Sequence, residues 1–449
     1  MDFFKSLKEN KILKNSITLI NGTIISQAIN VIMSPIMSRL YSPGDFGNYS
    51  TITAIVSIIT IIATGKYDLA IMDSKDTKKE CKSTYYLGMI LTIITCLIVL
   101  ILGTIYVEVS SVYNMLDIAL IAIFTFFASN NSILNIWLNK NGYYKQISKN
   151  RIIYSVVHIV CIVVFGFLKT GYLGIAFSAF LSYLAQCIYV YIFLKKKTDF
   201  NDYKIDFDEI KIQAKKHIKF PKFQMPSLLL NTASTQMPIL LFTNFFGSQV
   251  SGWYSMTIRI INLPMTIIGN SVGEIFFKEA SEIEKVGDRN RLSEFTYSTF
   301  KKIMLIGLVP MTLLICYGDI LFSFVLGQEW YMAGIYAMIL SPWYYIVFVT
   351  SPFTHLFTVL NMQKKNLVIN IIMLISRVLC IVIGAFAFTS NSLATIIIFA
   401  IVGFLIWVFF NGYLFKLIGI SYKKSVLNVI IILAVAVFIA IIPRIIFKF

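Results

Sequence analysis

The chain has 449 residues, of which 57% are hydrophobic and only 14% are charged, and its mean hydropathy is +0.77. Soluble domains carry about 25% charged residues, so this composition excludes an ordinary soluble protein and indicates an integral membrane protein. The formal net charge of +17 would suit nucleic-acid binding, so the positions of the basic residues must decide what that charge means.

Apolar runs recur along the chain at lengths that suit transmembrane helices rather than the short alternating strands of a β-barrel. The first run is too long for a signal-peptide core and lacks a cleavage site, so we expect it to remain as the first helix. About thirteen spans are predicted, at residues 16–40, 47–67, 84–107, 116–138, 151–168, 171–194, 223–246, 250–276, 301–317, 333–360, 366–389, 392–415 and 425–443.

The basic residues are distributed unevenly between the two sides of these spans. Counting alternate loops places 32 of the 39 Lys and Arg residues on one side. The other side carries Arg39, Lys169, Arg444 and Lys448, and three more basic residues lie within or at the ends of spans. This asymmetry predicts a cytoplasmic N-terminus. The positive charge therefore reflects membrane topology, and we expect no nucleic-acid partner.

Two polar stretches resemble each other across about two hundred residues. SRLYSPGDFGNYS covers residues 38–50 and TNFFGSQVSGWYS covers residues 243–255, and a proline, Pro35 or Pro238, precedes each stretch. Six spans precede a basic segment and six or seven follow it, which predicts two parallel repeats. The expected domains are a six-helix lobe, an amphipathic cytoplasmic linker, a second six-helix lobe and an extra C-terminal helix, at residues 1–194, 195–222, 223–416 and 417–449.

The first polar stretch also predicts a helix start. Ser42 can act as the cap, Pro43 suits the first helical position, and the carboxylate of Asp45 suits the third. The six cysteines show no CxxC spacing, so the sequence predicts neither a disulfide framework nor a metal site.

Four stretches together resemble the Wzx-type flippases of the multidrug/oligosaccharidyl-lipid/polysaccharide exporter superfamily, which handle O-antigen and capsule repeat units. They are SRLYSPGDFGNYS, ATGKYDLAIM, GWYSMTIRIINLP and VLGQEWYMAG. The resemblance implies an all-α polytopic fold like that of the multidrug exporters, with two six-helix bundles in a V around a cavity. It implies a cargo of undecaprenyl-pyrophosphate-linked oligosaccharide, moved from the cytoplasmic to the outer leaflet of the bacterial inner membrane by alternating access. Polysaccharide polymerase and chain-length regulator proteins are the partners that it suggests.

Basic side chains within spans are the first candidates for binding such a cargo. An arginine at a helix centre costs about 2.5 to 3.5 kcal/mol, and such residues usually face a cavity. We therefore predict that Arg259, Arg377 and Lys66 bind the pyrophosphate, which a guanidinium matches well. Two alternatives stay open, because an arginine can form a structural pair with another helix and Lys66 can extend to the membrane interface.

Polar side chains within spans are predicted to line the cargo path, although amides also bridge membrane helices. This set contains Gln27, Asn30, Asn131, Asn135, Asn231 and Gln236. Asp68 and Glu274 could bind a coupling proton or sodium ion, and no other cofactor is expected. Pro35 and Pro238 are predicted hinges. Arg39 and Asp45 are predicted to form an outer gate, or Arg39 to be an interfacial anchor.

Two other functions compete with the flippase. A multidrug or small-solute exporter of the same superfamily would favour acidic residues within the helices, and here the deep charges are positive. A membrane polysaccharide polymerase usually needs a sizeable outer loop with carboxylates or histidines, and the outer loops here are short. We therefore predict a transporter with no catalytic residues and no enzymatic activity.

Overall fold

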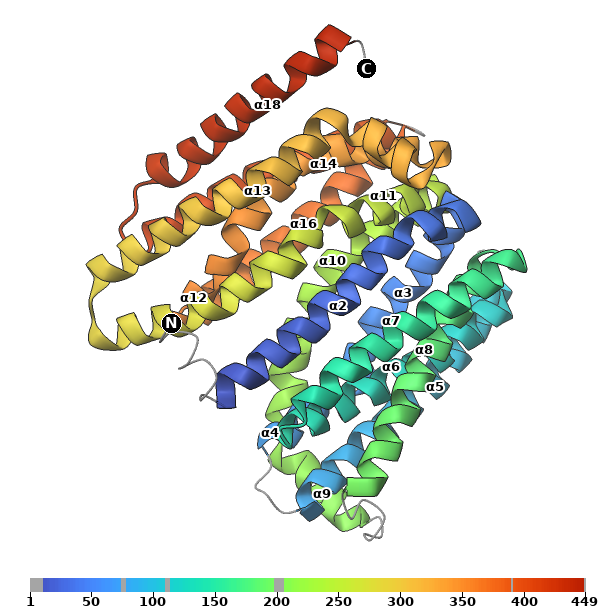
Figure 1. The fold of residues 1–449 in the computed structure, drawn as a ribbon. Coiled ribbons are helices and arrows are strands. Elements are labelled where there is room, and N and C mark those ends of the chain that lie inside the picture. Colours follow the sequence, from blue (N-terminus) through green and yellow to red (C-terminus); the bar gives the residue numbers. More distant parts are fainter. Residues whose placement is uncertain (1–10, 74–77, 110–113, 198–205, 389–390, 448–449) are drawn as a thin grey trace. The chain divides into compact units, whose positions relative to one another are not determined.

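The structure is a computed structural model that describes residues 11–73, 78–109, 114–197, 206–388 and 391–447 (Figure 1). In these residues all regular secondary structure is helical, as predicted. Within the described chain, ten helices are long and apolar enough to cross a membrane, and one bent pair would make eleven.

The structure has fewer apolar spans than the thirteen predicted. The bent pair consists of α11 (Ser248–Ile261) followed by Met265–Val286, which meet at an angle of 42°. The two predicted spans outside this set are α2 (Lys11–Leu40) and α10 (Met225–Phe246). Both helices are long enough to span a membrane, and amides and hydroxyls interrupt the apolar residues of α10. They are the first helices of the two predicted repeats.

Contacts divide the chain into two compact units. Unit 1 contains Met1–Tyr41 and Asn48–Gln236, and unit 2 contains Ser42–Gly47 and Met237–Phe449. The second boundary falls inside α10, next to Pro238. The first turn of the helix that follows α2 therefore belongs to unit 2, whereas the rest of that helix belongs to unit 1.

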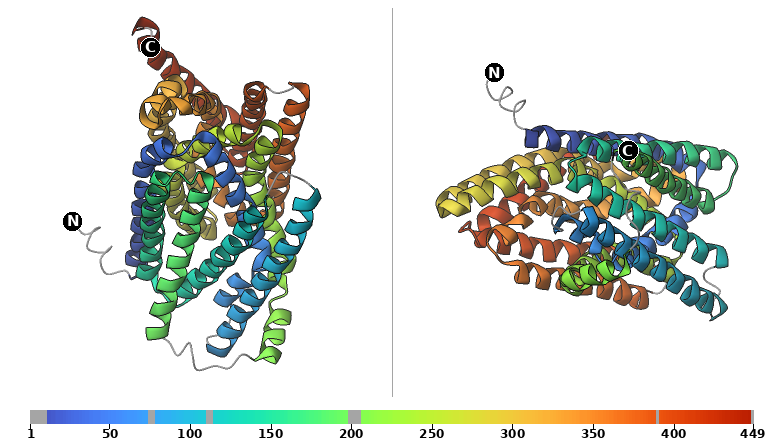
Figure 2. Two further views of the ribbon diagram at one scale, coloured as in Figure 1. Left: turned by 90° about the vertical axis from the view of Figure 1, so that its right-hand side faces the viewer. Right: turned by 90° about the horizontal axis from the view of Figure 1, so that it is seen from below.

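Unit 1 is a helical bundle in which α5 packs on α6, α6 on α8 and α8 on α7, while α2 lies along α7 (Figures 1 and 2). Gly22 permits this last contact, because a Cβ there would lie 2.5 Å from the Cβ of Ser148 on α7. Between α2 and α10, the elements are α3 (Pro43–Ala63), α4 (Tyr67–Asp73), α5 (Lys78–Val109), α6 (Met115–Lys140), α7 (Tyr144–Phe167), α8 (Tyr172–Lys197), α9 (Phe207–Lys216) and the π-helical η1 (Phe220–Gln224).

The predicted helix start after the first polar stretch is confirmed. α3 begins at Pro43, and the hydroxyl of Ser42 donates to Asp45 Oδ2 at 2.7 Å. The backbone N–H of Asp45 donates to the Ser42 hydroxyl at 3.2 Å in return. This reciprocal pair satisfies donors that the first turn of a helix leaves without partners.

The linker helix α9 is held to α5 by ion pairs. Lys79 Nζ lies 3.0 Å from Asp206 Oδ2, and Lys216 Nζ lies 3.0 Å from Glu80 Oε2. The hydroxyl of Tyr67 on α4 also donates to the carbonyl of Ala214 at 3.1 Å. These contacts dock the described part of the predicted linker on the bundle of unit 1.

Unit 2 is a second helical bundle, in which α13 packs against α14, and α14 against α11 and α17. Helix α16 packs against α17, and α18 lies along α13 (Figure 1). After α11 its elements are η2 (Met265–Gly269), α12 (Asn270–Val286), α13 (Arg289–Leu326), η3 (Gln328–Trp330), α14 (Tyr331–Thr350), η4 (Ser351–His355), α15 (Leu356–Val359), α16 (Gln363–Ala387), α17 (Ser392–Lys416), η5 (Lys423–Leu427) and α18 (Asn428–Phe447).

Helix α18 is fastened to a kink in α13. The backbone of Tyr317 leaves the helical region there, with φ of −133° and ψ of 16°. Arg444 donates to both carboxylate oxygens of Asp319, at 3.0 and 2.6 Å, and also to the carbonyl of Cys316 beside the kink. In return, the hydroxyl of Tyr317 donates to the carbonyl of Ala440 at 2.7 Å.

The ion pair between Asp319 and Arg444 gives a stability prediction. The side chain of Asp319 is only 8% exposed, so Asp319→Asn or Arg444→Gln leaves a buried charge without its partner. We expect each single variant to lose about 3 kcal/mol of unfolding free energy. The double variant Asp319→Leu/Arg444→Leu should lose less, because it leaves no charge behind. Thermal unfolding in detergent measures this order, and equal losses in all three variants would contradict it.

His217, next to α9, gives a pH prediction. Its burial, and then the charge of Lys216, lower the pKa of the imidazole, against the opposing effect of Asp73 and Glu80. A lowered folded-state pKa means that the stabilisation is present above the unfolded-state value of about 6.5 and is lost as the pH falls below it. The protection factors for hydrogen exchange in α9, which correct for the slower intrinsic exchange at lower pH, should therefore fall between pH 7.5 and 5.5. His217→Gln should remove this fall, and an unchanged pH profile in that variant would assign it to other groups.

Candidate functional site

Three of the four stretches that carry the family resemblance meet in unit 2. They contribute the turn Ser42–Gly47, the helix α11 and the segment Val325–Gly334 around η3. The fourth stretch, residues 63–72, lies in unit 1 and includes α4. Residues far apart in the sequence thus form one junction, which we call the motif junction.

The motif junction contains a reciprocal crossing of two glycines. A Cβ on Gly47 would lie 1.7 Å from the carbonyl oxygen of Ser248, and a Cβ on Gly252 would lie 1.8 Å from that of Pro43. Gly47 lies four residues after Pro43, and Gly252 lies four residues after Ser248. The two repeated sequences therefore cross through equivalent positions, and only glycine permits backbones to come this close.

Arg259 on α11 lies beside the same turn. Its guanidinium carbon is 5.9 Å from the ring centroid of Phe46, and this ring packs edge-on against Trp330 at 5.8 Å. Phe46 and Trp330 are both buried. A guanidinium over an aromatic ring gains a cation–π attraction of about 1 kcal/mol or more when it is partly desolvated. The ring pair thus supports a half-buried positive charge.

Two hydrogen bonds fix α11 relative to η3 and α14. The indole N–H of Trp253 donates to the carbonyl of Glu329 at 2.9 Å, and the hydroxyl of Thr257 donates to the carbonyl of Ala333 at 2.7 Å. Trp253 and Thr257 lie one helical turn apart on α11. They therefore set the position from which Arg259 extends.

Arg377 occupies an aromatic site formed by α11, α14 and α16. Its guanidinium carbon lies 5.6 Å from the ring centroid of Trp343. The hydroxyls of Tyr254 and Tyr344 form a hydrogen bond with each other. Both hydroxyls lie near enough to Arg377 to interact electrostatically with its guanidinium. Ser376 and Arg377 also line a narrow recess with Trp343. The site combines a cation with hydroxyls, which are groups that bind phosphates, and it packs them against the buried ring of Trp343.

Asp68 is the centre of a polar cluster in unit 1. Its side chain is fully buried, and its carboxylate lies 3.6 Å from Lys66 Nζ. The hydroxyls of Ser132 and Thr64 donate to it at 3.1 and 3.4 Å. Lys66 has a positive φ of 57°, in the turn between α3 and α4. Lys66 and Asp68 therefore form an ion pair, and the two charges compensate each other.

A chain of amides joins α6, α7 and α8. Asn150 Nδ2 donates to the side-chain oxygens of Asn131 at 2.9 Å and Asn135 at 3.2 Å. Gln186 Nε2 donates to the carbonyl of Asn150 at 2.8 Å. Asn131 and Asn135 thus bridge helices, which was the alternative to lining a path. Asn135 remains partly exposed and can do both.

The remaining predicted residues are placed but not brought into these clusters. Gln27 and Asn30 are half-buried on α2, and on α10 Gln236 is half-buried while Asn231 is exposed. Glu274 is exposed on α12, and Arg39 is exposed at the end of α2. Pro35 lies inside α2 and Pro238 inside α10, at the equivalent positions expected of hinges. Their roles in gating, coupling and cargo binding stay predictions.

The sequence alone does not single out several residues of these clusters. Phe46 and Trp330 lie within two of the stretches that carry the family resemblance, and Asn150 and Gln186 belong to the amide chain. An amide inside the predicted span 171–194 is the available signal for Gln186, whereas Asn150 directly precedes the predicted span 151–168. No group of three or more His, Cys, Asp or Glu residues in the described chain is arranged to bind a metal ion.

Comparison with known sequences gives two matches. A family profile described as polysaccharide biosynthesis protein matches residues 36–334. The capsular polysaccharide biosynthesis protein CapF from Staphylococcus aureus is 23% identical over 337 residues, which cover 73% of this chain and 81% of that protein. The profile match includes all three segments of the motif junction and the Asp68 cluster.

Comparison with solved structures identifies the fold. The lipid II flippase MurJ, in an inward closed conformation, is similar with a TM-score of 0.67 and 14% identity, over 97% of this chain and 99% of that one. An inward-facing multidrug resistance MATE family transporter has a TM-score of 0.60 and 14% identity, over 89% and 95% of the two chains. A superfamily transporter from Pyrococcus furiosus has a TM-score of 0.54 and 14% identity, over 91% and 97%. The fold is that of the superfamily that the resemblance implied.

The glycine crossing gives a prediction with a matched control. Gly252→Ala places a methyl group on the carbonyl of Pro43, so we expect it to cost about 1–3 kcal/mol of unfolding free energy. In Gly44→Ala the nearest atom would be 3.6 Å away, an ordinary contact, and its stability should stay close to wild type. Thermal unfolding in detergent compares the two variants. Equal stability of the two variants would show that the backbones at Gly252 and Pro43 can separate without loss of unfolding free energy.

Proposed function

Because the chain belongs to the family of polysaccharide biosynthesis proteins, we propose that it is a flippase for an undecaprenyl-pyrophosphate-linked oligosaccharide. It would move this lipid from the cytoplasmic to the outer leaflet of the bacterial inner membrane, with its own N-terminus in the cytoplasm. Its multi-pass transporter fold supports transport rather than enzymatic catalysis. The observation that carries the proposal is the aromatic site of Arg377, within a chain of this family and fold.

The cargo makes a demand that the Arg377 site can meet. Its pyrophosphate cannot cross hydrocarbon without cationic and hydrogen-bonding partners. The ring centroid of Trp343 lies 5.6 Å from the guanidinium carbon, and the guanidinium donors lie in the plane of the group, where they match phosphate oxygens. We assign Arg259, over Phe46, the same role as a second cation.

The Asp68 cluster suits coupling better than direct cargo binding. Lys66 is already compensated by Asp68, which weakens the attraction of its charge for an anion. Protonation of Asp68, or a sodium ion beside it, would release Lys66 and change the charge of this turn. Such a step could reset the carrier after transport, and Glu274 is the second predicted coupling residue.

The membrane potential favours the proposed direction of transport. A pyrophosphate with about two negative charges gains roughly 4 to 5 kcal/mol per 100 mV when it moves outward from a negative interior. A cationic site that moves with the cargo cancels part of this gain. Coupling to a proton or sodium ion would supply the remainder.

A multidrug exporter is the main alternative, and the described carboxylates support it less well. Such a carrier needs a buried acid for cationic drugs. Here Asp68 is engaged by Lys66, Asp319 by Arg444, and Asp117 by the hydroxyl of Tyr172 at 3.0 Å. A polysaccharide polymerase is a second alternative, and the transporter fold argues against it.

The arginines provide the test of the proposed function. In proteoliposomes, the wild-type protein should flip a fluorescent undecaprenyl-pyrophosphate oligosaccharide. Arg377→Ala and Arg259→Ala should each slow flipping by about ten- to a hundredfold, because each removes a charge-assisted contact with phosphate. Arg377→Lys should retain part of the activity, since it keeps the charge but loses the planar fork.

Arg289→Ala is the matched control for these variants. The side chain of Arg289 is 56% exposed at the start of α13 and pairs with Glu284, so its removal should leave flipping unchanged. All variants should be present in the membrane at wild-type levels. Wild-type flipping by both Ala variants would remove these arginines from the cargo site, and the absence of flipping by wild type would reject the function.

A further inference from the structure

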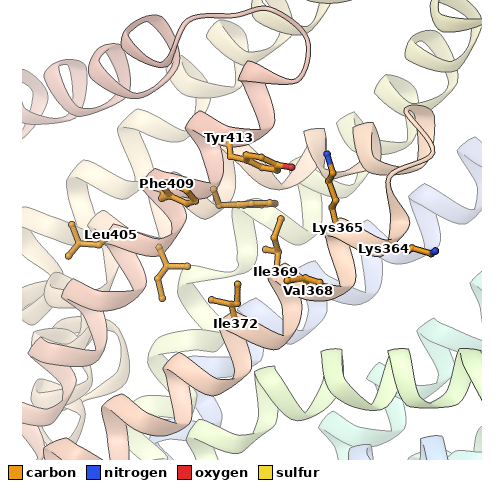
Figure 3. A pocket seen from close by; sticks show the side chains of 10 residues that line it. Lys364, Lys365, Val368, Ile369, Ile372, Leu405, Phe409 and Tyr413 are labelled. Carbon is orange, nitrogen blue, oxygen red and sulfur yellow. The ribbon is translucent and has the colours of Figure 1, made fainter.

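A deep apolar groove runs between α16 and α17 in unit 2 (Figure 3). Its volume is about 690 Å³, within the range of ligand pockets. Figure 3 shows the two walls facing each other, with Val368, Ile369 and Ile372 on α16 and Leu405, Phe409 and Tyr413 on α17. Both helices belong to the set that can span a membrane, and the groove runs along them.

The groove is open along its length to the surroundings of the helix pair. Leu405 is 58% exposed and Phe409 is 70% exposed, and on the opposite wall Val368 and Ile372 are also exposed. In a membrane-spanning helix pair such surfaces contact lipid chains. The groove is concave, however, so it can hold one chain against two walls, which a flat lipid-facing surface cannot do.

One end of the groove is basic and polar. Lys364 and Lys365 lie in the first turn of α16 and line this end of the groove with Tyr413; Lys365 points toward Tyr413, whereas Lys364 points away from it (Figure 3). Neither lysine is within ion-pairing distance of a carboxylate in the part of the chain that the structure describes. Lys416, at the end of α17, belongs to the same side of the membrane, which the distribution of basic residues identifies as cytoplasmic.

We propose that this groove binds the isoprenoid chain of a lipid-linked saccharide in the cytoplasmic leaflet, with Lys364 and Lys365 holding its pyrophosphate. This inference rests on the proposed flippase function and adds a loading site to it. From Lys365 to Ile372 the groove follows about 10 Å of helix, which matches the depth of the first isoprene units below a headgroup. Two ammonium groups suit a pyrophosphate, which carries two adjacent phosphates.

The groove also leads toward the Arg377 site. The narrow recess that contains Ser376 and Arg377 shares a lining residue, Ile406, with the groove. Arg377 lies twelve residues beyond Lys365 on the same helix, about 18 Å deeper along its axis. A lipid held at the lysines would therefore have its chain directed toward the deeper cation site, and its saccharide would remain on the cytoplasmic side.

Photo-crosslinking can identify the occupant of the groove. A benzophenone amino acid in place of Ile372 would lie in the groove. One in place of Ile375 is the control outside the groove, because the two side chains are almost equally exposed, at 52% for Ile372 and 51% for Ile375. In vesicles of phosphatidylcholine and phosphatidylglycerol, we expect radiolabelled undecaprenyl pyrophosphate to label the first position preferentially. Unlabelled undecaprenyl pyrophosphate should compete, and excess phosphatidylglycerol should not. Equal labelling of both positions, or competition by phosphatidylglycerol, would identify ordinary membrane lipid and overturn the proposal.

Two variants test the walls and the basic end separately. Leu405→Trp fills the groove, and Lys364→Gln/Lys365→Gln removes both charges. Each should weaken binding of undecaprenyl pyrophosphate by roughly ten- to thirtyfold and slow flipping at low substrate concentration. Ile375→Trp, which adds the same bulk outside the groove, should bind and flip like wild type.

The outcomes separate this inference from the proposed function. If wild type flips the lipid-linked oligosaccharide and the groove variants bind and flip equally well, the groove is not a loading site and the flippase function stands. If wild type does not flip this substrate at all, the proposed function fails. Binding of undecaprenyl pyrophosphate by wild type and by the groove variants then shows whether the groove is a lipid site.

Discussion

A charged side chain inside a membrane costs several kcal/mol unless protein groups replace the water around it. In the described residues this constraint is met in different ways. Two buried carboxylates are paired with a basic residue, Asp68 with Lys66 and Asp319 with Arg444. Arg377 lies beside the ring of Trp343. The first arrangement neutralises charge, whereas the second places a cation against an aromatic ring, which suits the proposed binding of an anion.

The glycine crossing places the second such arginine. Gly47 and Gly252 bring two backbones together, and this contact joins three stretches that are distant in the sequence. Phe46 is carried into the junction by the same turn and meets Arg259 there. A larger residue at either glycine would separate the segments. The position of Arg259 beside Phe46 therefore depends on glycine at both Gly47 and Gly252.

The two halves of the chain use their polar residues differently in the described structure. Unit 1 bonds its amides to one another, as Asn150 does with Asn131 and Asn135, and pairs the buried carboxylate of Asp68 with Lys66. Unit 2 places cations beside aromatic rings and provides the apolar groove of α16 and α17. This division favours cargo binding by unit 2 and structural or coupling roles for the polar clusters of unit 1.

The sequence alone determined the membrane class, the helical fold, the approximate spans, the repeated turn with its cap at Ser42, and the family. These follow from composition, from hydrophobic runs and from neighbouring residues, all of which are local properties of the chain. It did not reveal that Phe46 supports Arg259, that Arg444 fastens α18 to the kink at Tyr317, or that α16 and α17 enclose a groove. Those features need contacts between distant segments, and only packing in three dimensions decides which side chains meet.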